Sequence, residues 1–371
     1  MLRAGLLVPL LSLALAALAE PAPALADDDL RRIPSPGSDL DAEHGALLAP
    51  ILVPRVPGSS GSARVQRHFV DFFRANLPEW ELVWQNSTYN TPTTNNTDMP
   101  FANLAFRRDP PGVEAGSFSR LTLVAHYDSK LKPWGFIGAT DSAAPCAMLL
   151  HVARSIEGPL KAKWAKDGVL AQGQQRAPTG LQILLLDGEE AFEKWTATDS
   201  LYGARSLATQ WESESNGALS KYRSTLDSIS LFVLLDLLGS PNPKVPSYFK
   251  LTHWAYRTMA SVEGRMRGLG LLETKQQDAF LPDGELASSV VSTRRGIEDD
   301  HIPFMFRGVD ILHIIPSPFP LVWHTQDDDG PHLHPETVRD WARIVTGFTA
   351  ELMELGGYLS NKAPGRESKP S

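Results

Sequence analysis

The chain has 371 residues, of which 42% are hydrophobic, and a formal net charge of -8 at pH 7. This length and apolar content suit one large globular domain and exclude a disordered or fibrous chain. The acidic balance, with no concentration of Lys and Arg, excludes nucleic acid as a partner and makes a neutral or cationic substrate more natural.

The first residues are typical of a signal peptide. Arg3 supplies a positive start, residues 6–18 form a short apolar run, and residues 24–26 supply small side chains at a cleavable bond. We expect cleavage before Asp27, with cleavage after Ala19 as the second choice. An uncleaved anchor in the ER or Golgi is the alternative, but the apolar run is short for a span. No later stretch is apolar enough for one, so we expect a mature protein without a membrane span, secreted or lumenal in the secretory pathway.

Residues 27–60 are rich in Pro, Asp, Gly and Ser without clear periodicity, which predicts a flexible leader. Two glycosylation sequons begin at Asn86 and Asn95, in a polar stretch that suits an exposed loop and a secreted glycoprotein. Cys146 is the only cysteine, so no intramolecular disulfide is possible. Its apolar surroundings favour a buried, inert thiol over a nucleophile.

Beyond the leader, a helix is predicted from about Ser62, with Val65 and Phe69 on its apolar face. Short runs of Leu, Ile and Val then alternate with helical patterns, and their lack of polar alternation predicts strands covered on both faces. We therefore expect an α/β three-layer sandwich with a central, largely parallel mixed sheet flanked by helices. The predicted strands are residues 101–106, 121–125, 181–186, 231–235 and 311–315.

Two further segments complete the predicted organisation. Residues 159–180 have little periodicity and predict a surface insertion between a helix and the next strand. Residues 335–355 carry apolar side chains at helical spacing, followed by a polar end. The predicted division is a signal peptide at 1–26, a leader at 27–60, a single catalytic domain at 61–358 and a disordered tail at 359–371, in a monomeric protein.

Polar side chains follow the apolar run at several predicted strand ends. In open α/β sheets, ligands bind at the carboxyl ends of the strands. One acid at such a position is better explained by capping or a turn, so the prediction rests on the whole set. Carboxylates and imidazoles without thiolates favour a catalytic zinc that keeps one coordination position open. The set comprises His126, Asp128, Asp141, Asp187, Glu189, Glu190, Asp236 and His324.

The adjacent acids Glu189 and Glu190 can have two different chemical roles. Neighbouring side chains point in different directions, so one can bind a metal while the other faces the substrate. The free carboxylate would then transfer protons, which requires a pKa raised toward neutrality by burial. Taken alone, such a pair is equally typical of a solvated helix start.

Several blocks of the sequence resemble the glutaminyl-peptide cyclotransferases, a family similar in fold to the zinc aminopeptidases of the bacterial leucyl type. The resemblance extends over roughly residues 65–355. It is carried by GATDSAAPCAM at 138–148, DGEEAF at 187–192 followed by Trp195 and DSLYG at 199–203, LDLLG at 235–239, DDHIPF at 299–304, and IPSPFP at 315–320 followed by Trp323, His324 and Thr325.

The resemblance implies an enzyme that cyclises the N-terminal glutamine, and more slowly glutamate, of peptides and proteins to pyroglutamate with release of ammonia. It implies one Zn²⁺ per chain, held by Asp141, Glu190 and His324, with Glu189 as the proton shuttle. Asp236 and Asp299 are implied to hydrogen-bond to each other and to receive the leaving ammonia. The implied substrate pocket comprises Trp195, Glu298, His313, Phe319 and Trp323, with His313 also supporting the two aspartates.

Two positions depart from the family pattern, and two other functions compete. Ala125 stands where animal members often have a second cysteine, and Glu298 stands where Gln is common. A two-zinc aminopeptidase is the main alternative, because His126 and Asp236 stand where that family places ligands of a second metal, with Asp141 bridging. A non-catalytic binding protein that kept the fold is the other, although every expected ligand position is filled.

Overall fold

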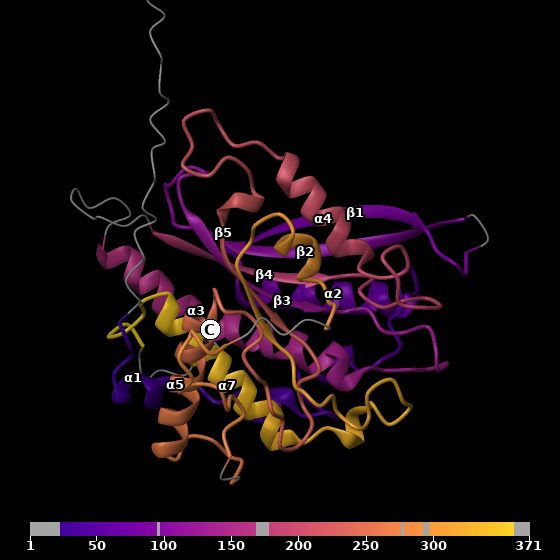
Figure 1. Cartoon of the computed structure of the whole chain (residues 1–371). Helices are drawn as coiled ribbons and strands as arrows, with labels where there is room; N and C mark the ends of the chain where they lie inside the picture. The colour runs from indigo at the N-terminus through magenta and orange to yellow at the C-terminus, as the bar shows by residue number, and fades with distance from the viewer. Residues whose placement is uncertain (1–22, 95–96, 168–177, 276–277, 292–296, 360–371) are drawn as a thin grey trace, which may run out of the picture.

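The computed structural model describes residues 23–94, 97–167, 178–275, 278–291 and 297–359. Its centre is a six-stranded mixed sheet in the order β1-β2-β4-β3-β5-β6 (Figure 1). The strands β3, β4, β5 and β6 run parallel, whereas β2 is antiparallel to both β1 and β4. The strands are β1 (Glu81–Asn90), β2 (Asp98–Arg108), β3 (Ser119–His126), β4 (Thr179–Leu186), β5 (Ile229–Leu235) and β6 (Ile311–Ile314).

Helices cover both faces of this sheet. Successive strand residues point to opposite faces, so Leu123 joins the larger core cluster on one side while Val124 joins a second cluster on the other. This double burial explains why the strands read as continuous apolar runs. The predicted α/β sandwich is confirmed. Helices α2 (Ser60–Asn76), α3 (Ala144–Asp167), α5 (His253–Gly268) and α7 (Pro335–Leu352) pack on the first face, and α4 (Tyr202–Ser213) and α6 (Ile302–Met305) on the second (Figure 1).

The register of the parallel strands brings their carboxyl ends to one edge. His126, the last residue of β3, pairs with Leu186, the last residue of β4. Val233 of β5 lies beside Leu123 of β3, so β5 ends at the same edge. The polar residues that follow these strands therefore converge, as the sequence predicts.

The expected flexible leader is instead packed against the domain. It contains the short helix α1 (Asp27–Arg32), which contacts α5, and its Leu30 and Ile33 are buried in the core. The imidazole Nε2 of His151 on α3 also lies 3.3 Å from the Pro34 carbonyl oxygen. These apolar side chains are dispersed among Pro, Gly and Asp, so they enter the core singly and leave no periodic pattern.

The start of the described chain bears on the expected cleavage site. Leu25 is buried, and its N–H group donates to the Glu351 carboxylate at 3.1 Å. Its carbonyl oxygen accepts from Arg265 at 2.5 Å. Cleavage before Asp27 would remove these contacts, whereas cleavage after Ala19 would keep them. The rest of the expected signal, residues 1–22, lies outside the described residues, as does the tail from residue 360.

Two local expectations differ from the structure. The sequon at Asn86 lies on β1, not in a loop, because β1 is an edge strand whose exposed positions, apart from Trp84, carry polar side chains; Asn86 itself is exposed. Asn95 lies outside the described residues. The expected insertion at 159–180 begins as a continuation of α3, which runs through Pro159 to Asp167, and residues 168–177 are outside the described part.

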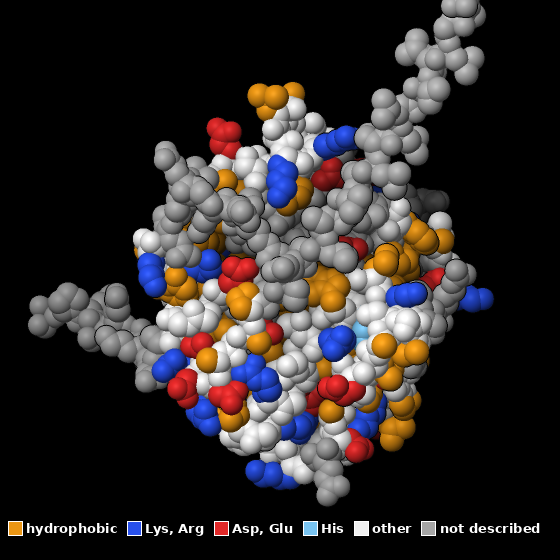
Figure 2. Space-filling model, turned by 60° about the vertical axis from the view of Figure 1, so that its left-hand side comes forward, with side chains coloured by type: hydrophobic (Ala, Val, Ile, Leu, Met, Phe, Trp, Pro, Cys, Tyr) orange, Lys and Arg blue, Asp and Glu red, His pale blue; other side chains and the backbone are white. Residues whose placement is uncertain are grey.

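On the surface shown in Figure 2, acidic and basic side chains are interspersed and the basic ones do not gather into a broad patch. Among the described helices, none combines the length and the apolar character needed to cross a membrane.

Candidate active site

Two glycines shape the loops that carry acidic side chains at the sheet edge. Gly138 has a φ of 63°, and a Cβ atom there would lie 2.1 Å from the carbonyl oxygen of Asp141. Gly188 has a φ of 73°, and its Cβ would lie 2.3 Å from the Phe101 ring. Both positions therefore require glycine. They allow the tight turns that present Asp141 after β3 and the Glu189–Glu190 pair after β4.

Asp141, Glu190 and His324 form one cluster in which each residue offers a ligand atom within 4.8 Å of the others. His324 Nε2 lies 3.4 Å from Asp141 Oδ2 and 3.7 Å from Glu190 Oε1. The two carboxylates are buried, whereas the His324 side chain is 29% exposed. The cluster is thus closed on the carboxylate side and open toward solvent on the imidazole side.

This donor set fits a metal ion. Glu190 Oε1 is buried and has no hydrogen-bond partner in the described part of the chain, and burial together with the charge of Asp141 raises the pKa of Glu190 well above its usual value. A cation placed between these carboxylates would supply the missing partner and compensate their repulsion. One imidazole and two carboxylates with an accessible side match the ligands of a catalytic zinc site. The other Glu190 oxygen, Oε2, accepts from Lys130 Nζ at 3.0 Å.

Asp128 fixes the backbone of both glutamates. Its Oδ1 accepts from the Glu189 N–H group at 3.1 Å, and its Oδ2 accepts from the Glu190 N–H group at 3.2 Å. Asp128 is fully buried. The two glutamate side chains are therefore held in different directions from one anchored turn. The sequence marks Asp128 as a polar strand-end residue, but its hydrogen bonds to both N–H groups depend on how β3 and β4 meet.

His126 links this anchor to the metal-type cluster. Its Nε2 lies 3.0 Å from Asp141 Oδ1 and 3.5 Å from Asp236 Oδ1, and its Nδ1 lies 3.4 Å from Asp128 Oδ1. Burial by itself would lower the pKa of His126, but these three carboxylates raise it well above its usual value. A charged imidazole can thus hold the surrounding carboxylates together.

Glu189 lies beside the cluster and has the environment of a proton-transfer group. It is buried, and burial raises its pKa well above the usual value of a glutamate. The charges of Glu190, Asp299 and Asp300 act in the same direction, whereas His126 opposes them. A carboxyl group with a raised pKa exchanges its proton near neutral pH more readily than an ordinary glutamate.

Asp236 and Asp299 do not form the expected hydrogen bond to each other among the described contacts. Asp236 Oδ1 instead accepts from the Ser142 hydroxyl group and, at 2.8 Å, from the Leu237 N–H group. Asp299 Oδ2 accepts from His313 Nε2 at 2.7 Å. The reason is electrostatic: two nearby carboxylates that each find a donor avoid their mutual repulsion. Burial and the charge of Asp299 raise the pKa of Asp236, whereas His313 outweighs burial and lowers that of Asp299.

Aromatic side chains from the predicted pocket adjoin the cluster. The Trp323 ring stacks on the His324 imidazole with centroids 3.9 Å apart, and Phe319 packs edge-on against Trp323 at 4.8 Å. Trp195 lies on another loop, where its indole N–H donates to Glu298 Oε2 at 2.9 Å. Trp323 is 39% exposed and Glu298 is exposed, so solvent reaches both side chains.

Two other groups have metal-type ligand sets. His126, Asp141 and Asp236 form one, and Asp299, His301 and His313 form the other. All members of both groups are buried. Neither group therefore has the exposed side that distinguishes the cluster containing His324.

Cys146 is buried, and burial raises the pKa of its thiol to about 12, so the thiol is neutral and unreactive, as expected. Its Sγ lies 3.1 Å from the carbonyl oxygen of His126. Ala125, at the position of the missing second cysteine, is buried in the apolar core.

Comparison with known proteins gives the same family from sequence and from structure. Residues 113–349 match the model of peptidase family M28. The chain is 41% identical over 314 residues to the glutaminyl-peptide cyclotransferase-like protein of Bos taurus, covering 83% of this chain and 75% of that protein. It is 38% identical to the glutaminyl-peptide cyclotransferase of Bothrops jararaca, with 83% and 80% covered. The glutaminyl cyclase of Macrostomum lignano superposes with a TM-score of 0.73 at 31% identity, covering 91% of this chain and 95% of that structure.

Proposed function

Because this chain belongs to the glutaminyl-peptide cyclotransferases, within the fold of peptidase family M28, we propose that it cyclises N-terminal glutamine of peptides and proteins to pyroglutamate and releases ammonia. N-terminal glutamate would be a slower substrate. The observation that carries this proposal is the juxtaposition of Asp141, Glu190 and His324 with the buried acid Glu189. Metal ligands and a proton carrier are the two components that this cyclisation needs.

The metal would be one Zn²⁺ per chain, held by Asp141, Glu190 and His324. When bound, it would polarise the carbonyl of the substrate's side-chain amide and stabilise charge that develops on that oxygen. The support for a single ion is the exposed side of this cluster, since a catalytic zinc needs one position open to substrate. His126 and Asp128 would orient the ligands from behind.

Glu189 would move the proton. Its carboxylate takes a proton from the substrate α-amine as the amine nitrogen attacks the side-chain carbonyl carbon, and it returns that proton to the departing amide nitrogen. One C–N bond forms, another breaks, and ammonia leaves without consumption of water. Both reacting groups belong to one residue, so positioning supplies much of the catalysis.

The remaining side chains would bind the substrate and receive the leaving ammonia. Trp195, Phe319 and Trp323 would wall the pocket and shield the reacting centre from water. Asp236 and Asp299, with His313 bound to Asp299, would receive the leaving ammonia at the buried end. Glu298 would contact the substrate at the rim, where its side chain already accepts from Trp195.

One observation favours a second candidate, a two-metal aminopeptidase. His126, Asp141 and Asp236 lie within reach of a common ion, and Asp141 would bridge two metals. Against it, His126 is fully buried and already faces three carboxylates, so a second ion there would have no open position for substrate. Metal analysis of the purified protein separates the candidates, with one zinc per chain for the cyclase and two for the aminopeptidase.

We propose that the enzyme acts as a monomer in the secretory pathway, secreted or lumenal, and without a membrane span after removal of its signal peptide. The exposed sequon at Asn86 supports glycosylation there. The contacts of Leu25 support cleavage after Ala19. Intact mass of the protein recovered from a eukaryotic culture medium tests the cleavage site and the glycan together, and sedimentation equilibrium tests the monomer.

Turnover of short peptides tests the proposed reaction. A peptide that begins with Gln should release ammonia, whereas the same peptide with an acetylated α-amine should not, because the nucleophile is blocked. A peptide beginning with Leu should remain intact. Release of free leucine, or no ammonia from the Gln peptide, would refute the proposal.

A further inference from the structure

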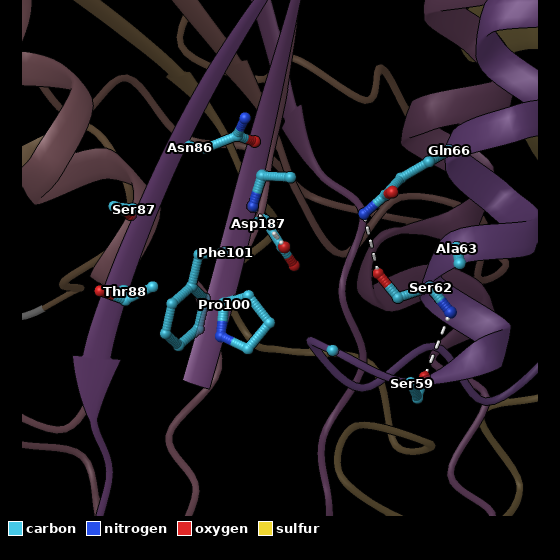
Figure 3. Close-up of a pocket in the computed structure, with 12 residues that line it drawn as sticks. Ser59, Ser62, Ala63, Gln66, Asn86, Ser87, Thr88, Pro100, Phe101 and Asp187 are labelled. Carbon is cyan, nitrogen blue, oxygen red and sulfur yellow. Dashed lines mark hydrogen bonds between the residues drawn. The ribbon is translucent and has the colours of Figure 1, made fainter. Parts of the chain in front are cut away.

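A cavity of about 430 Å³ is lined by both polar and apolar residues, and these are distinct from the residues assigned to the proposed active site. It is formed by the first turns of α2, the β1–β2 hairpin and Asp187 at the end of β4. Figure 3 shows the Asp187 carboxylate directed into the space between Pro100 and Phe101 on one side and Ser62 and Gln66 on the other. None of the residues proposed to bind the metal, move the proton or wall the substrate pocket lines it.

Asp187 has an unused acceptor at this cavity. The side chain is 1% exposed, and its Oδ2 accepts from the Ala102 N–H group at 2.9 Å. Its Oδ1 is buried without a hydrogen-bond partner among the described residues. Leaving a buried carboxyl oxygen unpaired is costly, and burial together with the charge of Asp128 raises the pKa of Asp187 well above its usual value. A ligand that donates a hydrogen bond would remove that cost.

Gln66 uses the hydrogens of its side-chain amide within the protein. Gln66 Nε2 donates to Ser62 Oγ at 3.2 Å and to the Tyr127 hydroxyl at 2.8 Å, which leaves its Oε1 as the acceptor end. The Tyr127 hydroxyl in turn donates to the Ala102 carbonyl oxygen at 2.7 Å. The residues that line the cavity include no Lys, Arg or His. The cavity thus presents one acidic group among neutral hydroxyl and amide groups, and its described lining has no positively charged side chain.

The chemistry of this lining selects one class of ligand. A divalent metal prefers several carboxylates, and only one is present. An anion would meet Asp187 without a compensating cation. An ammonium group has hydrogens for several acceptors, and Pro100 and Phe101 provide an apolar wall for an attached carbon chain. The volume leaves room for such a chain, because a single water-sized group takes up only about 30 Å³.

We propose that this cavity is a binding site for a primary ammonium group, with Asp187 as its acceptor. The chain's net charge of -8 favours the approach of such a cation. Two ligands carry such a group. One is the ammonium ion that the enzyme would release, and this possibility rests on the proposed function. The other is a larger amine, and this possibility does not depend on the proposed function.

Calorimetric titration of the full chain with n-butylammonium, ammonium and tetramethylammonium chlorides tests the site. Protein whose intact mass shows no glycan at Asn86 is used, because Asn86 also lines the cavity. We expect n-butylammonium to bind, and tetramethylammonium, which has no N–H group, to bind at least about tenfold more weakly. Ammonium that binds as tightly as n-butylammonium indicates the reaction product as the source; selective binding of n-butylammonium indicates a larger amine.

Two variants assign the binding to this cavity. Asp187→Asn removes the charge with little change of shape, and Ala63→Leu fills the cavity from α2 while leaving Asp187 in place. Both should weaken n-butylammonium binding at least about tenfold. Asp340→Asn is the matched control, because Asp340 is also buried and bonded to backbone N–H groups, but lies on α7 outside the cavity.

The proposal is overturned if n-butylammonium does not bind the wild type, if tetramethylammonium binds equally well, or if Ala63→Leu binds as the wild type does. Each of these results means that the cavity holds water only or that the amine binds elsewhere, for example at the active-site metal. If Asp187→Asn fails to fold, the Ala63→Leu variant alone tests whether the amine binds in this cavity. Binding is measured without turnover, so failure of this site is distinguishable from failure of the proposed reaction.

Discussion

The Nε2 atom of His126 lies 3.0 Å from the Oδ1 atom of Asp141, and both side chains are buried at the carboxyl edge of the sheet. Asp141 therefore presents its other oxygen, Oδ2, toward His324, which lies 3.4 Å away. His126 thus orients a carboxylate of the proposed zinc site without belonging to the exposed cluster itself.

Replacing His126 with Gln should weaken metal binding. Groups that orient a metal ligand typically contribute about 10–100-fold to affinity, and Asp141 would lose its buried partner. Competition with a chromophoric chelator measures the change, with His332→Gln as the control because His332 is half exposed and pairs with Asp329, away from the metal-type cluster. Undiminished affinity, or the loss of one of two bound metals, would argue against the orienting role.

Replacing Glu189 with Gln should abolish most of the turnover while leaving the metal bound. Gln keeps the shape of the side chain but cannot carry the proton, and a positioned acid–base group contributes about 10²–10⁴-fold to rate. The measurement is kcat on a Gln-initiated peptide, paired with the metal content of the same sample. Glu193→Gln, at an exposed position of the same loop, should retain its rate. Wild-type kcat in the Glu189 variant would remove the proton-shuttle assignment.

Replacing Leu30 with Ala should destabilise the protein by about 2–5 kcal/mol, as expected for a fully buried leucine. Denaturant unfolding measures the difference. The exposed Leu251, at 83% exposure, provides the control, and Leu251→Ala should change stability by less than about 0.5 kcal/mol. If residues 27–60 did not pack against the domain, Leu30→Ala and Leu251→Ala would have equal free energies of unfolding.

Because of His151, the free energy of unfolding should decrease as the solution becomes acidic. Burial, with the nearby charge of Arg154, lowers the pKa of its imidazole to about 4 from the usual 6.5. Between these two pKa values the unfolded chain binds a proton that the folded chain does not bind. The free energy of unfolding therefore decreases as the pH falls from about 6.5 to about 4. The loss through this one group reaches up to about 3 kcal/mol, since each pKa unit corresponds to about 1.4 kcal/mol.

The corresponding variant is His151→Gln. Its free energy of unfolding should fall less than that of the wild type between pH 7.5 and pH 4.5. His44→Gln, at a site where the side chain is 88% exposed, should keep the wild-type slope. Equal slopes for His151→Gln and the wild type would contradict the lowered pKa.

The features that could be predicted from the sequence are those encoded locally. Five of the strands are apolar runs because helices cover both faces, and the residues after them converge because parallel strands end at one edge. The sequence motifs also identified the family correctly. The resemblance to that family also implied Asp141, Glu190 and His324 as one set of ligands, although they lie far apart along the chain.

The features that could not be predicted depend on tertiary contacts. Strand β1 is an edge strand with exposed polar positions, so its pattern resembles a loop. Leu30 enters the core as a single side chain, without a periodic partner. The two hydrogen bonds of Asp128, and the separate partners of Asp236 and Asp299, are set by how loops from different strands meet.

The central claim is cyclisation of glutamine, as opposed to hydrolysis of the peptide. Incubation of a Gln-initiated peptide with the enzyme in ¹⁸O-labelled water, followed by mass spectrometry, tests it most directly. The account predicts a product lighter than the substrate by one ammonia and free of ¹⁸O, because the α-amine is the nucleophile and no water is consumed. A peptide that lacks its first residue, together with free glutamine that carries ¹⁸O in its carboxyl group, would contradict it.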